Sequence, residues 1–119
     1  MTPLQVERTR VDGLDVLMVE GELDIATAPR MISALNEALA EGEDPLVVDL
    51  SEVLFMDSTG LALLINARRR SLRSKRGFAI VCPGGPISRL FEIADMVERL
   101  RVRPDRDSAR LAATQPARA

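Results

Sequence analysis

Residues 45–61 have the sequence PLVVDLSEVLFMDSTGL, in which a short apolar run leads into a cluster of small polar residues. The run Pro45–Leu50 is bounded by residues that interrupt regular structure, which is typical of a buried strand in a parallel sheet. Asp57, Ser58 and Thr59 each have a short side chain whose oxygen can accept a hydrogen bond from an unpaired amide at a helix start. The segment therefore predicts a strand that leads into a helix, with three polar side chains at the junction.

On both sides of this junction, apolar segments alternate with turn residues. Two segments rich in Val, Leu and Met flank Asp12-Gly13, a dipeptide that favours tight hairpin turns. Thr27-Ala28-Pro29 has the composition of a helix start, with Thr27 as a candidate cap. Predicted strands cover residues 4–10, 14–23, 45–50, 78–82 and 97–102, and predicted helices cover 27–42, 61–72, 87–94 and 107–113. The order β-β-α-β-α-β-α-β-α predicts one α/β domain over residues 1–113, followed by a flexible tail, 114–119.

Several residue types are missing or scarce among the 119 residues. There is no histidine, the usual general base and commonest metal ligand, so we expect no catalytic activity, cofactor or metal. A serine hydrolase centred on Ser58 would also lack the Gly-x-Ser-x-Gly pattern. Cys82 is the single cysteine, which precludes an intrachain disulfide and favours a reducing, cytoplasmic location. No apolar block approaches the roughly 20 residues of a membrane span.

Charge is divided unevenly along the chain. The first 67 residues carry 13 acidic and 3 basic side chains, a formal charge of −10, whereas residues 68–119 carry 5 and 13, a formal charge of +8. The densest basic run lies within residues 68–76. It has two interpretations, a solvated end of a helix or a contact with an anionic partner. Because the run contains no aromatic residue, we expect no specific binding of nucleic acid.

Ser58 itself has two interpretations. In the first, Asp57 or Ser58 caps the following helix and has no other role. In the second, Ser58 accepts a phosphate, because the N-terminus of a helix favours an anion and phosphorylation adds about −1.5 to −2 charge. Without a histidine to activate it, Ser58 is an unlikely nucleophile. With Asp57 adjacent, the main effect of a phosphate would fall on a docked partner.

Two segments together resemble a known bacterial family. The signature of the anti-sigma factor antagonists, the STAS domain family, is similar to residues 48–51 (VDLS) and 55–61 (FMDSTGL). A second recurrent segment of that family is similar to residues 21–24 (GELD), with Thr27 and Ala28 close behind. The resemblance implies a STAS-like domain with a mixed sheet of about four to five strands and helices mainly on one face.

The same resemblance implies a function. In that family the serine after the aspartate, here Ser58, is phosphorylated by a cognate anti-sigma factor that is also a serine kinase. The unphosphorylated protein would capture this kinase and release a sigma factor, and a serine phosphatase would reset the switch. Asp24, Asp57, Thr59 and Gly60 would form the partner-binding surface together with Ser58. Thr59 stands where a second serine often occurs, which makes it a minor alternative acceptor.

Alternatives remain open at this stage. Asp24 is also a favoured residue type for capping the helix that follows it. STAS-like domains also serve as scaffolds and as subunits of lipid-transport complexes, which are not phosphorylation switches of this kind. Phosphorylation of Ser58 distinguishes these functions. The resemblance further implies a monomer in the free state.

Overall fold

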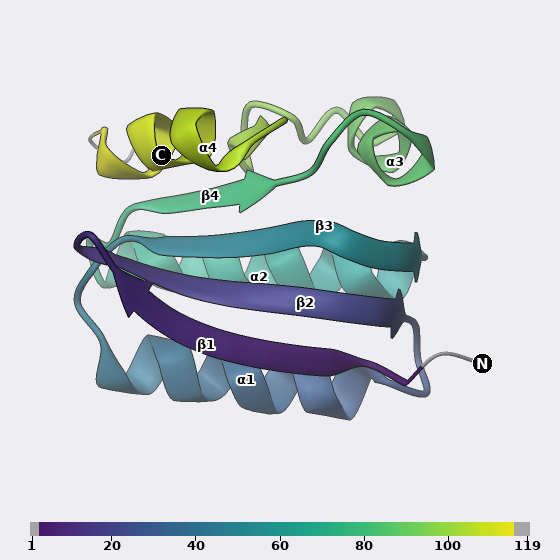
Figure 1. The fold of residues 1–119 in the computed structure, drawn as a ribbon, viewed down its shortest axis with the longest axis horizontal. Coiled ribbons are helices and arrows are strands. Elements are labelled where there is room, and N and C mark those ends of the chain that lie inside the picture. Colours follow the sequence, from purple (N-terminus) through teal and green to yellow (C-terminus); the bar gives the residue numbers. More distant parts are fainter. Residues whose placement is uncertain (1–2, 116–119) are drawn as a thin grey trace.

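The computed structural model describes residues 3–115 as a single α/β domain. In this part of the chain, five strands form one mixed sheet in the order β1-β2-β3-β4-β5, accompanied by four helices (Figure 1). The strands are β1 (Gln5–Val11), β2 (Leu14–Leu23), β3 (Leu46–Met56), β4 (Phe78–Val81) and β5 (Val102–Arg103). The helices are α1 (Ala28–Glu41), α2 (Ser58–Arg73), α3 (Pro86–Ile93) and α4 (Arg106–Thr114). The predicted element order and fold class are confirmed.

The sheet has one antiparallel pair and three parallel pairs among the described strands. β1 pairs antiparallel with β2, and Asp12 and Gly13 between them have positive φ angles of 51° and 75°, as a tight hairpin turn requires. β2, β3, β4 and β5 run parallel to one another. The carboxyl ends of β2 and β3 therefore lie side by side at one end of the sheet, where each strand leads into a helix.

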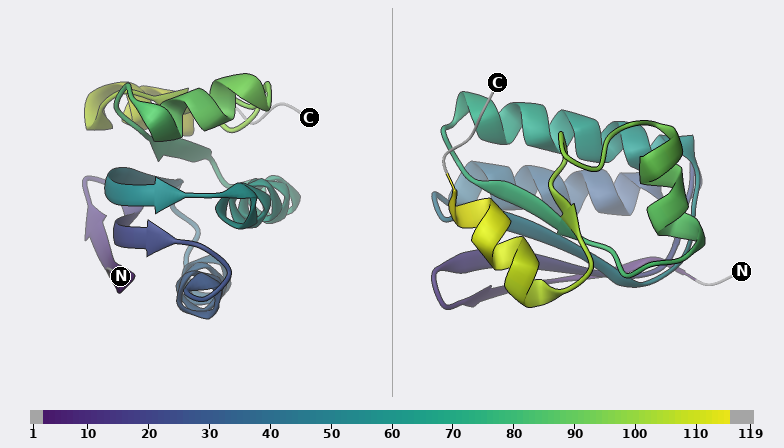
Figure 2. Two further views of the ribbon diagram at one scale, coloured as in Figure 1. Left: turned by 90° about the vertical axis from the view of Figure 1, so that its right-hand side faces the viewer. Right: turned by 90° about the horizontal axis from the view of Figure 1, so that it is seen from above.

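Helices cover the two faces of the sheet unequally. The main core includes Met31 of α1, Leu64 of α2 and Phe91 of α3, packed against one face of the sheet. α4 packs its alanines on the other face, forming a smaller cluster with side chains of β2, β3 and β4 (Figure 2). The prediction of helices mainly on one face is confirmed, and α4 is the exception.

β3 is longer than its predicted bounds. The prediction ended the strand at Leu50, but the strand continues to Met56 along the end of β2, where Leu23 pairs with Met56. Pairing with β4 stops earlier, at Asp49. Ser51 and Glu52 obscured this continuation because their polar, exposed side chains interrupt the apolar pattern.

The predicted strand 97–102 is mostly wrong. Residues 97–101 form turns, and only Val102–Arg103 pairs with β4. The amides in this region bond locally, as in the hydrogen bond of 2.8 Å from Val102 N–H to the Val97 carbonyl. Arg101 has a φ of 51°, which is incompatible with an extended strand.

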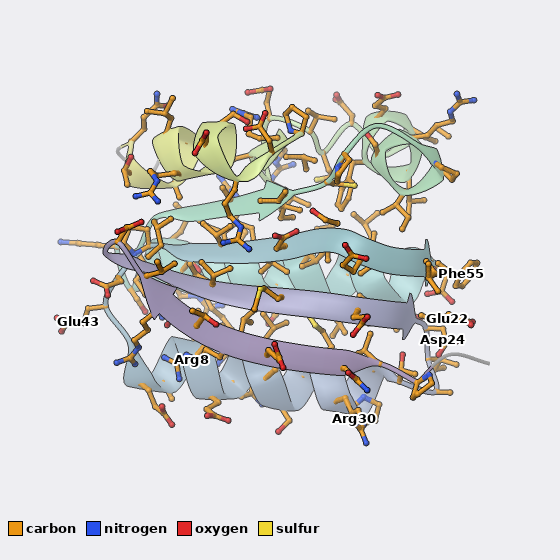
Figure 3. The ribbon with its side chains drawn as sticks, in the orientation of Figure 1. Arg8, Glu22, Asp24, Arg30, Glu43 and Phe55 are labelled. Atoms are coloured by element: carbon orange, nitrogen blue, oxygen red, sulfur yellow. The ribbon has the colours of Figure 1, made fainter. Side chains whose placement is uncertain are left out.

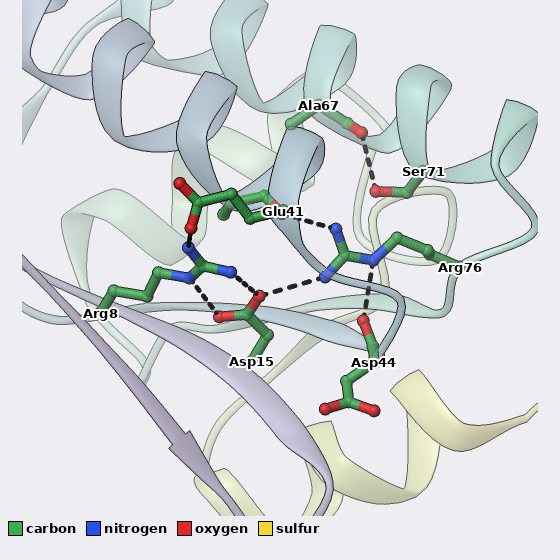
Figure 4. Close-up of polar contacts among 8 residues, drawn as sticks. Arg8, Asp15, Glu41, Asp44, Ala67, Ser71 and Arg76 are labelled. Atoms are coloured by element: carbon green, nitrogen blue, oxygen red, sulfur yellow. Dashed lines mark hydrogen bonds and ion pairs between the residues drawn. The ribbon is translucent and has the colours of Figure 1, made fainter.

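A buried ion-pair network occupies the opposite end of the sheet, where the parallel strands begin (Figure 4). Both carboxylate oxygens of Asp15 accept hydrogen bonds of 2.8 Å from Arg8, and Arg76 donates a third bond of 3.2 Å. Arg76 also donates to the backbone carbonyls of Ala38 and Asp44, each at 2.8 Å. The side chains of Asp15 and Arg76 are 0% and 3% exposed. This network joins β1, β2, α1 and the turn before β4.

Candidate functional site

The Ser58 junction lies at the carboxyl end of the sheet, beside the turn that leads from β2 into α1. The Asp57 N–H donates to the Leu23 carbonyl at 3.4 Å, which holds the start of α2 against the end of β2. Figure 2 (left) looks onto this end, with α2 seen end-on from its start, α3 above and α1 below. The two segments that resemble the family signatures, residues 21–24 and 55–61, therefore meet here.

The helix cap at the junction is Asp57. Its carboxylate accepts a hydrogen bond of 2.9 Å from the Thr59 N–H, and its carbonyl accepts from the amides of Gly60 and Leu61. Ser58 is the first residue of α2 and is exposed. Within residues 3–115, the Ser58 hydroxyl makes no hydrogen bond. Of the two candidate caps, Asp57 has the structural role, and the Ser58 hydroxyl is left to solvent.

Gly60 is buried in the first turn of α2. A Cβ atom at this position would lie 2.5 Å from Met56 Cγ and 2.9 Å from Leu23 Cδ2. The missing side chain thus lets the helix start pack closely on the ends of β2 and β3. Thr59, predicted as a minor alternative acceptor, is half-buried and its amide is held by Asp57.

Asp24 organises the turn between β2 and α1. Its Oδ1 accepts hydrogen bonds from the amides of Ala26 and Thr27, at 3.0 and 3.1 Å. Thr27 occupies the cap position of α1, but its side chain makes no capping bond; its hydroxyl donates to the Glu22 carbonyl at 2.8 Å. Asp24 therefore does not cap α1 itself, because the amides that it binds precede the helix and the cap position is Thr27; it holds the turn that leads into α1. Glu22, Asp24 and Phe55 project at the same end of the molecule (Figure 3).

Exposed apolar side chains accompany the polar junction, and the sequence analysis did not single them out. Ile25 in the turn after β2 is 80% exposed, and Leu54 and Phe55 at the end of β3 are 70% and 48% exposed. Ile93 at the end of α3 is 78% exposed. Large apolar side chains gathered in one region indicate a surface for a protein partner. The sequence could have revealed them, because these apolar residues lie outside the periodic pattern of the core.

Cys82 follows β4 and is buried, at 4% exposure. Burial, together with the nearby Asp49 carboxylate, raises the pKa of the Cys82 thiol to about 11. The thiol is therefore protonated at neutral pH and is a poor nucleophile. Over residues 3–115, no group of three or more cysteine, aspartate or glutamate side chains is arranged to hold a metal ion. No helix in the same range has both the length and the apolar character to cross a membrane.

Comparison with known proteins places the chain in a family. A model of the STAS domain matches residues 5–109. The chain belongs to the STAS domain family. Over 99 residues it is 31% identical to the anti-sigma-B factor antagonist of Staphylococcus aureus. The match covers 83% of this chain and 92% of that protein. The corresponding antagonist of Staphylococcus epidermidis is 30% identical over the same coverage.

A solved structure agrees with this assignment. The crystal structure of an anti-sigma factor antagonist from Mycobacterium paratuberculosis superposes with a TM-score of 0.85 and 29% sequence identity. The match covers 94% of this chain and 95% of that one. This STAS protein is thus a member of the anti-sigma factor antagonists.

Proposed function

We propose that this STAS protein binds an anti-sigma factor that is also a serine kinase, and that it thereby releases a sigma factor. Phosphorylation of Ser58 by that kinase ends the binding, and a serine phosphatase restores it. The observation that carries the proposal is the exposed Ser58 hydroxyl, which is left without a structural hydrogen bond because Asp57 caps α2. The Ser58 side chain is therefore accessible to an enzyme and dispensable for the fold.

The charge of a phosphate explains why binding would end. Phosphorylation adds about −1.5 to −2 charge next to Asp57, and the helix dipole offsets only part of it. The domain tolerates this charge because Ser58 is exposed to water. A partner that covers Ser58 would instead have to desolvate or repel it, at a cost to the complex. Asp24, Asp57, Thr59 and Gly60 shape the surface that the partner contacts.

The apolar surroundings of Ser58 favour a protein partner. Ile25, Phe55 and Ile93 expose large apolar side chains around the junction. Burial of such side chains supplies most of the affinity of protein interfaces, while charged groups control specificity and rate. The partner interface therefore combines apolar contacts with one modifiable hydroxyl.

The direct test is phosphorylation by the cognate anti-sigma factor kinase with ATP, followed by mass measurement. Wild type is expected to gain one phosphate, and Ser58→Ala none. Ser33→Ala is the matched control, because Ser33 is also exposed on a helix, on α1. Comparing Thr59→Ala with wild type measures how much phosphate is attached to Thr59, the minor alternative acceptor. If Ser58→Ala gains phosphate as wild type does, Ser58 is not the site. If wild type gains none, a scaffold or a lipid-transport subunit becomes the better assignment.

A further inference from the structure

Residues from the end of β3 and from helix α3 line a groove. The end of β3 and α3 lie at the same end of the molecule (Figure 1), where β3 leads into the Ser58 junction. The groove is lined by Met56, Gly85, Pro86, Arg89, Leu90 and Ile93. Met56 and Ile93 were described above at the candidate site, whereas Gly85, Pro86, Arg89 and Leu90 extend the lining beyond it. The groove is open to solvent and most of its lining is apolar, which is the form of a recess for a side chain from another protein.

The lining combines a fixed floor with an exposed rim. Met56 and Leu90 pack against the main core, so the floor is held in place by the fold. Ile93, on the rim, is 78% exposed. Gly85 in the lining has a φ of 152°, a backbone conformation that L side chains rarely adopt, so this part of the lining carries no side chain. A contact that covers both the exposed isoleucine and the apolar floor removes the most apolar surface from water, which favours binding.

Met56 connects the groove physically to the Ser58 junction. Its side chain forms part of the groove wall and also lies under Gly60, where a Cβ atom would be only 2.5 Å from Met56 Cγ. Ser58 follows Met56 by two residues. A protein that covers the first turn of α2 therefore extends naturally over the groove.

The charges around the two features differ in sign. Asp24 and Asp57 place carboxylates at the junction, whereas Arg89 places an exposed guanidinium in the groove lining. A complementary partner has a carboxylate opposite Arg89, because guanidinium and carboxylate pair with matching geometry. The occupant that fits both properties is an apolar side chain with an acidic neighbour.

We infer that this groove is a second contact for the anti-sigma factor, which inserts an apolar side chain between Met56, Leu90 and Ile93 and pairs an adjacent carboxylate with Arg89. This inference rests on the proposed function, since it names the same partner. It adds a contact that phosphorylation does not alter chemically. The groove sets the affinity and choice of partner, and Ser58 sets whether the complex persists.

The test measures affinity for the purified cognate anti-sigma factor by titration calorimetry with the unphosphorylated full chain. Ile93→Asp is expected to weaken binding at least tenfold, because the partner would cover the added charge at the rim of the groove. Leu111→Asp is the matched control, since Leu111 is 65% exposed on α4 and lies away from the groove; its affinity should stay within twofold of wild type. Arg89→Gln is expected to weaken binding several-fold and to reduce its dependence on salt.

The outcomes separate the two proposals. If Ser58→Glu weakens binding while Ile93→Asp and Arg89→Gln do not, the groove contact is wrong and the proposed function stands. If Ile93→Asp weakens binding while Ser58→Glu does not, the groove stands and the charge switch is wrong. If wild type does not bind, both are overturned. Sedimentation of the protein alone tests a second copy as the occupant: a dimer that Ile93→Asp abolishes would overturn the assignment to the anti-sigma factor.

Discussion

The two ends of the sheet differ in how their polar and apolar groups are used. At the amino end, Asp15 and Arg76 are buried and fully bonded within the fold (Figure 4). At the carboxyl end, Ser58 is exposed and Ile25 and Ile93 remain open to water. Among residues 3–115, no buried side-chain nitrogen or oxygen lacks a hydrogen-bond partner. Of the seven large apolar side chains that are exposed in this range, four lie at the carboxyl end, where a partner is proposed to dock: Ile25, Leu54, Phe55 and Ile93.

This contrast separates stability from function. The amino end holds β1, β2 and α1 together through groups that solvent hardly reaches, so changes there should affect folding. The carboxyl end leaves side chains exposed that contribute little to the fold, so changes there should affect binding. The following predictions test this division, beginning with the largest expected effect.

Replacing Asp15 with alanine should lower the free energy of unfolding by about 3–5 kcal/mol, because the buried Arg76 would keep its charge without a counter-ion and Arg8 would keep only the exposed Glu41. Urea denaturation measures the loss. Glu41→Ala is the control: Glu41 also bonds Arg8 but is 56% exposed, so we expect a loss of about 0–1 kcal/mol. A loss below about 1 kcal/mol for Asp15→Ala would contradict the importance of the buried network.

Acid should weaken the amino end selectively. Burial raises the pKa of the Asp15 carboxyl, but the hydrogen bonds and charges of Arg8 and Arg76 outweigh it and hold the pKa below its usual value. The stabilisation is fully present above the unfolded-state pKa, about 3.9, and is lost as pH falls from there through the lowered folded-state value. Urea denaturation from pH 7 to pH 2 should show this loss. Arg8→Gln should make the acid-dependent loss smaller; an unchanged pH profile would exclude Arg8 as its cause.

Two glycines allow a matched comparison of the ends. At the amino end, a Cβ atom at Gly77 would lie 1.7 Å from the Ala113 carbonyl oxygen, so Gly77→Ala must displace α4 and should cost about 1–3 kcal/mol. At the carboxyl end, Gly60→Ala would meet flexible side-chain atoms of Met56 and Leu23. Its better helix propensity, up to about 1 kcal/mol, offsets part of that cost. Thermal unfolding should therefore show the larger loss for Gly77→Ala, and the reverse order would contradict it.

Replacing Ser58 with glutamate should have the smallest effect on stability, about 0.3–1 kcal/mol, because a charge in the first turn interacts only weakly with the helix dipole and the side chain is exposed. Affinity for the anti-sigma factor should fall nevertheless, by less than phosphate would cause, since the carboxylate carries less charge. Melting temperature and calorimetric titration measure the two quantities separately, with Ser33→Glu as the control. A large loss of stability would mean that Ser58 supports the fold.

The uneven charge along the chain could be read from the sequence, but the ion pairs that it forms could not. The basic run 68–76 was interpreted as a solvated face or a partner contact, yet its last member, Arg76, is buried against Asp15. Arg106 and Arg110 likewise pair with Asp49 and Asp12 of the acidic first half. Sequence shows that opposite charges exist in the two halves, but ion pairs between residues 57 to 98 positions apart depend on how the sheet folds.

Local sequence patterns were sufficient to predict most of the helices and strands. The Asp12-Gly13 hairpin and the polar residues at the start of α2 depend on neighbours in sequence, which is why they were predicted correctly. The two errors of extent have nonlocal causes: residues 51–56 are held in β3 by β2, and Val102–Arg103 is a strand only because β4 lies beside it. The function of Ser58 as a phosphate acceptor stays a prediction, as do the domain bounds 1–113. Residues 116–119 of the predicted tail lie outside the described residues.

The amino-acid sequence alone established the α/β element order and the strand-to-helix junction at Ser58, because periodicity and capping act over a few residues. It left open whether Asp57 or Ser58 caps α2, since both side chains have the right chemistry. Tertiary structure decided this by pairing the ends of β2 and β3, which positions Asp57 as the cap and leaves the Ser58 hydroxyl exposed. The same packing brought Met56 and α3 together into a groove beside it. Contacts between distant segments exist only once the chain has folded.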